Sequence, residues 1–126
     1  ERGSDKLYTD AMSAKTYSKL LELGIMLTTQ GFTVILDAKY DKQNIRADVI
    51  LAAKKHQIPL KIIQCTAPEK ILRDRLNRRS GDITDATANL LSSQLQNTEP
   101  FSDGEKSYLK IIDTTKPLET QLEELI

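Results

Sequence analysis

The chain has 126 residues, the size of one ordinary domain, and 18 Lys plus Arg against 18 Asp plus Glu. A net charge of zero argues against a general nucleic-acid binder, which needs a basic surface to displace counterions from phosphates. One Cys and one His are too few for a disulfide framework or a structural zinc site. No apolar run approaches the roughly 20 residues that span a bilayer. We therefore expect a single cytoplasmic domain over residues 1–126 with no membrane or nucleic-acid partner.

The first half of the chain alternates helical and strand patterns. Residues 10–30 predict a helix with a broad apolar stripe, and Gly31 stands where a left-handed residue would end it. Residues 32–37 are a nearly continuous apolar, β-branched run that closes on an acidic residue, which is typical of a strand buried on both faces. A second helix is predicted at 41–56, with Asp41 as its N-cap.

The second half continues this alternation. The expected elements are a strand at 60–65, a helix to about 79, a helix at 84–97, a loop at 98–105, a strand at 108–112 and a last helix from Pro117. Thr66–Glu69 matches a capping box with Pro68 in the first turn, so the helix after the 60–65 strand should begin there. Strands that alternate with helices imply right-handed crossovers. The predicted fold class is α/β, three-layered, with a mostly parallel sheet and helices on both faces.

Three side chains with possible chemistry follow the predicted strands. In open α/β sheets, ligands bind beyond the carboxyl ends of the strands, where these assignments place Asp37, Cys65 and Asp113. An acidic residue there can hold Mg²⁺ beside a nucleotide phosphate. Capping of the following turn is the simpler alternative for both aspartates, and Cys65 is most simply a small buried hydrophobe.

A cluster of arginines closes the helix after the second strand. Arg73, Arg75, Arg78 and Arg79 lie within seven residues and are followed by a turn that contains Gly81. Arginines that flank a crevice can neutralise charge on a transferring phosphoryl group, whereas a solvated helix face is the alternative interpretation. None of the five glycines is followed by Lys, so the chain contains no Walker A phosphate loop.

Several short motifs stand in the order of a known family. They are Leu7–Met12, Thr16–Leu23, Leu36-Asp37-Ala38, Cys65–Glu69, Leu72–Leu76 with Arg79, Thr84-Asp85-Ala86, Gln94, Glu99-Pro100, and Ile112-Asp113-Thr114 with Pro117-Leu118. Together they resemble bacterial P-loop kinase-like ATPases. These are relatives of gluconate and shikimate kinases and are often fused to an aminoglycoside-phosphotransferase-like domain. The pattern departs at Lys39, where Thr is usual.

The resemblance implies that residues 1–126 are the C-terminal portion of a P-loop kinase-like domain whose phosphate loop lies upstream. It implies catalytic roles for Asp37, Arg75 and Arg79, with Asp37 also the magnesium ligand. It implies nucleotide or substrate binding for Arg46, Arg78, Asp113 and Thr114. Mg-ATP is the cofactor expected for the complete domain, and none is required for this fragment, which we expect to be inactive alone.

Two functions remain open from the sequence. The first is part of an ATP-dependent phosphotransferase, which acts on a nucleotide and a small-molecule acceptor and to which this chain supplies lid arginines and a nucleotide-base loop. The alternative is a non-catalytic nucleotide-fold module for binding or assembly, which Lys39 and the missing phosphate loop favour. Without the phosphate-loop strand, the strands at 32–37 and 60–65 would have unpaired edges. We predict that they pair directly, exchange with a second copy or keep a partner segment.

Overall fold

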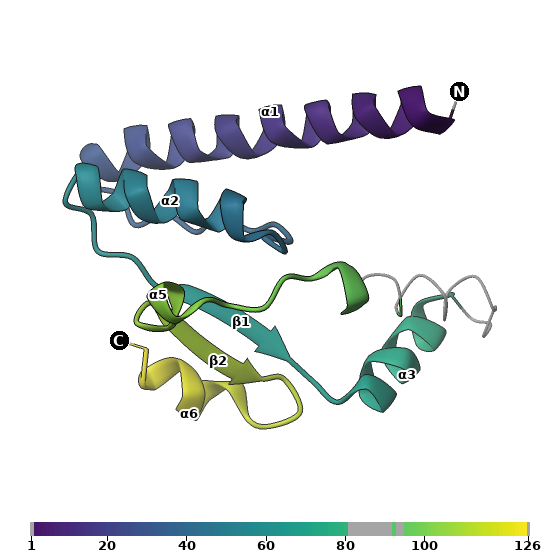
Figure 1. Cartoon of the computed structure of the whole chain (residues 1–126). Helices are drawn as coiled ribbons and strands as arrows, with labels where there is room; N and C mark the ends of the chain where they lie inside the picture. Colours follow the sequence, from purple (N-terminus) through teal and green to yellow (C-terminus); the bar gives the residue numbers. More distant parts are fainter. Residues whose placement is uncertain (1, 81–91, 93–94, 126) are drawn as a thin grey trace. The chain divides into compact units, whose positions relative to one another are not determined.

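The computed structural model describes residues 2–80, 92 and 95–125, with the backbone alone for residues 2–10 and 79–80. The chain divides into two compact units, Glu1–Leu60 and Lys61–Ile126, which are described one at a time (Figure 1). Within the described residues, no helix is both long and apolar enough to cross a membrane.

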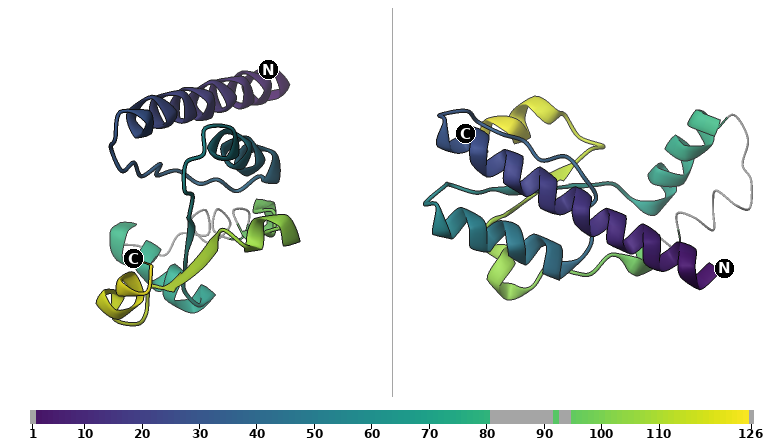
Figure 2. Two further views of the ribbon diagram at one scale, coloured as in Figure 1. Left: turned by 90° about the vertical axis from the view of Figure 1, so that its left-hand side faces the viewer. Right: turned by 90° about the horizontal axis from the view of Figure 1, so that it is seen from above.

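The first unit contains two helices, α1 (Arg2–Thr29) and α2 (Gln43–Lys55), which lie alongside one another (Figures 1 and 2). α1 begins eight residues earlier than the apolar stripe predicts. Its end confirms the role expected of Gly31, which has a φ of 96°. The Phe32 amide donates to the Leu27 carbonyl and the Gly31 amide to that of Thr28, the two hydrogen bonds of a Schellman motif.

The entry into α2 differs from the prediction by one residue. Lys42, with extended φ and ψ of −112° and 136°, is the N-cap, and the Arg46 amide donates to its carbonyl. The expectation that Asp41 caps this helix is therefore wrong. In the preceding turn, Tyr40 has a φ of 46°, and Lys42 is still extended. The chain therefore adopts helical geometry only after Lys42.

The predicted strand at 32–37 is wrong. The segment is irregular in the structure and forms no ladder with any part of the chain that the structure describes. Apolar, β-branched residues favour an extended backbone, but a strand also needs a partner for its N–H and C=O groups. Leu36 nevertheless packs on α1 against the buried Gly24. A Cβ atom added at Gly24 would lie only 3.2 Å from the side chain of Leu36.

The second unit is built on two parallel strands, β1 (Ile62–Thr66) and β2 (Leu109–Asp113), which pair from Ile62 with Leu109 to Thr66 with Asp113. The helices of this unit are α3 (Glu69–Ser80), α5 (Asp103–Lys106) and α6 (Leu118–Glu123). The predicted α/β class and the parallel pairing are confirmed. Ile112 in β2 is buried, with 4% of its surface exposed.

Apolar side chains stay accessible on both faces of the sheet within this unit. Ile63 and Cys65 share one face and are exposed, Ile63 by 50%, whereas Ile111 lies on the opposite face by the strand register and is 61% exposed. The expectation that Cys65 is a buried hydrophobe is therefore wrong. The sequence pattern is that of strands covered on both faces, whereas the described residues of this unit cover the sheet only in part.

Two helix starts in the second unit differ from the sequence reading. The Thr66 hydroxyl donates to the Ile112 carbonyl across the sheet, 3.3 Å away, so it does not cap α3 as predicted. The loop predicted at 98–105 contains the start of α5, where Glu105 Oε1 accepts from the Ser102 amide at 3.0 Å and hydroxyl at 3.1 Å. Of the helix predicted at 84–97, residues 92 and 95–97 are helical, and the rest lies outside the described residues.

Candidate functional site

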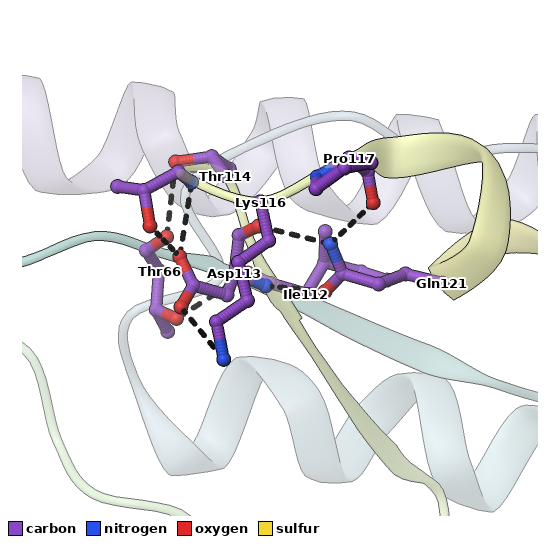
Figure 3. A network of polar contacts seen from close by, with 8 residues as sticks. Thr66, Ile112, Asp113, Thr114, Lys116, Pro117 and Gln121 are labelled. Carbon is purple, nitrogen blue, oxygen red and sulfur yellow. Dashed lines mark hydrogen bonds and ion pairs between the residues drawn. The ribbon is translucent and has the colours of Figure 1, made fainter.

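The carboxyl ends of β1 and β2 form the first candidate site, in the second unit. The chain crosses from strand to turn there through Thr114, whose amide donates to the Thr66 carbonyl at 2.8 Å. Its hydroxyl donates to the same oxygen at 3.0 Å (Figure 3). These bonds extend the parallel ladder by one residue beyond Asp113. They fix the turn at the sheet edge where open α/β folds bind their ligands.

Arg75 joins α3 to this turn. Its Nη1 donates to the Thr114 hydroxyl at 2.7 Å and its Nη2 to the Thr114 carbonyl at 3.1 Å. The side chain is exposed. A guanidinium carries five N–H donors, so two bonds leave others available for an anion such as a phosphate.

Asp113 sits in this turn with its carboxylate already engaged. Oδ1 accepts from the Thr115 amide at 2.9 Å and from the Thr115 hydroxyl at 2.6 Å. These bonds hold the pKa of Asp113 below its ordinary value, with the hydroxyl as the largest cause, and the charges of Lys116 and Arg75 add to the effect. The arrangement is the turn-capping geometry that the sequence left open as an alternative.

Gln121 is a residue of this site that the sequence reasoning missed. Its Oε1 accepts from the Asp113 amide at 2.8 Å, and its Nε2 donates to the Asp113 carbonyl at 3.0 Å and the Pro117 carbonyl at 2.9 Å (Figure 3). One side-chain amide thus pairs with both backbone groups of Asp113, as a neighbouring strand would. A polar residue among the apolar positions of the last helix is the signal that could have found it.

The other arginines of α3 have different surroundings. Arg73 forms an ion pair with Glu69 at 2.7 Å and donates to the Ser92 hydroxyl at 3.4 Å. Arg78 is exposed, and the side chain of Arg79 lies outside the described residues. The structure therefore brings together Arg75, Asp113 and Thr114, while the roles expected of Arg78 and Arg79 stay predictions.

The second candidate site is the loop between α1 and α2 in the first unit. Asp37, Ala38 and Lys39 are exposed in this loop. Arg46, by contrast, is 2% exposed and donates from Nη1 to the Tyr40 carbonyl at 2.8 Å. Its surroundings are those of a buried side chain that holds the loop, and the nucleotide-binding role expected of it stays a prediction.

The described carboxylate, His and Cys side chains are scattered. No group of three or more of these side chains gathers among the described residues. The magnesium role expected of Asp37 stays a prediction, since a single protein carboxylate can hold this ion beside substrate phosphates and water.

Comparisons with known proteins identify the family of this chain. A family model described as an AAA domain matches residues 1–101, which is more than half of the chain. The chain belongs to this family. The match identifies a P-loop kinase-like, nucleotide-binding domain and includes Asp37 and the arginines of α3, whereas Asp113 and Thr114 lie beyond the matched residues.

Three curated proteins are similar to this AAA domain. The uncharacterized proteins Rv2004c and MT2060 of Mycobacterium tuberculosis and Mb2027c of Mycobacterium bovis are each 29% identical to it over 114 residues. The alignment covers 90% of this chain and 22% of each relative, so the chain spans about a fifth of their length. No solved structure gives a significant match.

Proposed function

We propose that this AAA domain is part of an ATP-dependent phosphotransferase that acts on a small molecule. The contact between Arg75 and Thr114 carries the proposal, because it places an arginine of α3 at the carboxyl edge of a parallel sheet. A guanidinium at this edge can neutralise the charge of a phosphoryl group during transfer. The turn at Asp113 and Thr114 would then lie near the nucleotide base, as the family resemblance implies.

Mg-ATP is the cofactor that the family resemblance implies, and each unit by itself offers side chains of suitable chemistry. When bound, it supplies the transferable phosphoryl group and a cation that offsets its charge. Asp37 is exposed and has a carboxylate that would hold the ion. Arg75 and Arg78 are exposed guanidinium groups that would contact phosphate oxygens, and Arg79 would join them. The phosphate loop itself would come from residues outside this sequence.

The chemical class of the acceptor and the domain content of the complete protein are proposed from the family resemblance alone. Gluconate and shikimate kinases phosphorylate small hydroxyl compounds, and an acceptor of that kind suits a related domain. The curated relatives are several times longer than this chain, which leaves room for an aminoglycoside-phosphotransferase-like domain in the same protein.

The test is the rate of Mg²⁺-dependent ATP hydrolysis by the full-length protein. We expect Asp37→Asn, and Arg75→Ala combined with Arg79→Ala, each to lower kcat by about 100-fold or more, because charge stabilisation in the transition state is lost. Asp74→Asn and Arg73→Ala are matched controls on α3, since Asp74 is exposed and Arg73 is paired with Glu69. Wild-type rates in both test variants would exclude the proposed roles.

A non-catalytic nucleotide-fold module is the second candidate. Two observations favour it: Lys39 is an exposed cation two residues from Asp37, and Arg75 already has hydrogen-bond partners in Thr114. A full-length protein that binds a fluorescent ATP analogue but does not hydrolyse ATP would support the module. Hydrolysis that depends on Asp37 would exclude it.

A further inference from the structure

Two positions on α1 anchor the loop that carries Asp37. Tyr17 and Gly24 are seven residues apart in sequence, which is about two turns and places them on one face of the helix roughly 10 Å apart. The side chain of Leu36 packs against the buried Gly24. The hydroxyl of Tyr17 accepts a hydrogen bond from the Tyr40 amide at 3.3 Å. The loop is therefore attached to α1 on both sides of residues 37–39.

The anchor at Tyr40 holds both backbone groups of that residue. While Tyr17 binds the amide, Nη1 of the buried Arg46 donates to the Tyr40 carbonyl at 2.8 Å. The Tyr17 and Tyr40 rings meet edge to face with centroids 5.0 Å apart. The Tyr40 hydroxyl oxygen is buried without a hydrogen-bond partner among the described residues, and burial raises the pKa of this phenol.

This anchor maintains an unfavourable backbone conformation. Tyr40 has a φ of 46°, in the left-handed region that bulky residues rarely occupy. Such a conformation persists only where the surrounding structure imposes it, and it often occurs beside functional residues. Tyr17 and Arg46 bind the backbone N–H and C=O of Tyr40 in this conformation.

Residues 37–39 lie between the two anchors and are exposed. The four steps from Leu36 to Tyr40 can span at most about 14 Å, against roughly 10 Å between Tyr17 and Gly24 along α1. The two attachments therefore limit how far residues 37–39 can move from α1. The exposed residues of the loop are thus restricted in position, although the loop pairs with no strand among the described residues.

We propose that Tyr17, Gly24 and Arg46 are positioning residues that fix Asp37 for the magnesium ion of Mg-ATP. They act through Leu36 and Tyr40 and do not touch the ligand themselves. The inference rests on the proposed function for the role of Asp37, and it deepens that function by assigning Arg46 to the support of the loop.

Tyr17→Phe in the full-length protein tests the proposal, because it removes the hydroxyl and keeps the ring against Tyr40. We expect the Tyr40 amide to exchange with deuterium about tenfold faster, since its acceptor is lost. We also expect the Mg²⁺ concentration for half-maximal ATP hydrolysis to rise several-fold, with the KM for ATP at saturating Mg²⁺ unchanged. Arg46→Lys, which keeps the positive charge and an N–H donor group, should show a smaller rise than Arg46→Met.

The control is Tyr108→Phe, which removes a phenol hydroxyl from the second unit and should change neither measurement. Unchanged exchange at Tyr40 in Tyr17→Phe would overturn the anchor. Faster exchange with an unchanged Mg²⁺ dependence would overturn the positioning role while the proposed function stands. If Asp37→Asn itself keeps full activity, the role proposed for Asp37 fails and the positioning role fails with it, whereas exchange at Tyr40 still reports whether the anchor exists.

Discussion

Two segments of this chain have nearly the same sequence pattern and different structures. Phe32–Leu36 and Leu109–Ile112 are both rich in apolar, β-branched residues, with Lys110 inside the second, and each is followed by an aspartate, Asp37 or Asp113. The second run is a strand paired with β1, whereas the first forms no ladder within the described residues. The comparison teaches that such a pattern favours an extended backbone, and that only a partner makes the segment a strand.

The two aspartates differ in the same way. Both oxygens of Asp113 have neighbours: Oδ1 accepts twice from Thr115, and Oδ2 lies 4.0 Å from the Lys116 ammonium. Asp37 is exposed in a loop that is anchored on either side. The carboxylate of Asp113 thus serves its own turn, whereas that of Asp37 is exposed.

The largest expected effect is a difference in stability between a variant at a buried isoleucine of one run and a variant at an exposed isoleucine of the other. Ile112, just before Asp113, is 4% exposed, and Ile35, two residues before Asp37, is 87% exposed. We expect Ile112→Ala to lower the free energy of unfolding by about 2–4 kcal/mol, because it leaves a cavity. Ile35→Ala should change it by less than about 0.5 kcal/mol. Urea denaturation of the two variants measures the difference.

Equal losses at Ile112 and Ile35 would break this comparison. They would mean that the Phe32–Leu36 run is covered in solution, by another segment of a longer chain or by strand exchange with a second copy. Light scattering at several protein concentrations separates these cases, since only exchange between copies gives a dimer.

A smaller effect on stability is expected from Gln121, whose side-chain amide pairs with the backbone of Asp113 in β2. Gln121→Ala removes three hydrogen bonds to the Asp113 and Pro117 backbone. We expect a loss of about 1–2 kcal/mol in unfolding free energy and faster deuterium exchange at the Asp113 amide. Thr120→Ala, an exposed change on the same helix, is the control. Similar values for both variants would show that Gln121 does not support the turn.

The smallest effect concerns the charge of Asp113. Its pKa is lowered in the folded state, so ionisation stabilises the fold above its ordinary value of 3.8, and this contribution is lost as pH falls through the lowered pKa. Asp113→Asn keeps an acceptor for Thr115 but carries no charge. We expect its deficit against wild type, measured by urea denaturation, to be constant near pH 7 and to shrink towards pH 3. A deficit that does not change with pH would mean that the hydrogen-bond geometry alone matters.

Much of the local structure could be predicted from individual residues. Gly31 ends α1 because glycine enters the left-handed region without steric cost, and Pro117 precedes α6 because its fixed φ suits a helix start. Other features depend on contacts between distant residues. Thr66 was predicted to cap α3, but its hydroxyl bonds Ile112 across the sheet, 46 positions away in the chain.

The candidate site shows the same division. The arginine cluster of α3 was visible in the sequence, but only the structure identifies Arg75 as the member that reaches Thr114. Gln121 and Tyr17 gave no sequence signal of comparable strength, because one amide or phenol gains its role from the backbone group that it meets.

The sequence by itself determined the α/β class, the helices α1, α2, α3 and α6, and the apolar runs, because these follow from residue periodicity and local backbone preference. The tertiary structure decided which run became a strand, which aspartate remained exposed and which side chains hold the two loops. Those outcomes depend on hydrogen bonds and packing between residues far apart in the chain, and such contacts leave no periodic mark in the sequence.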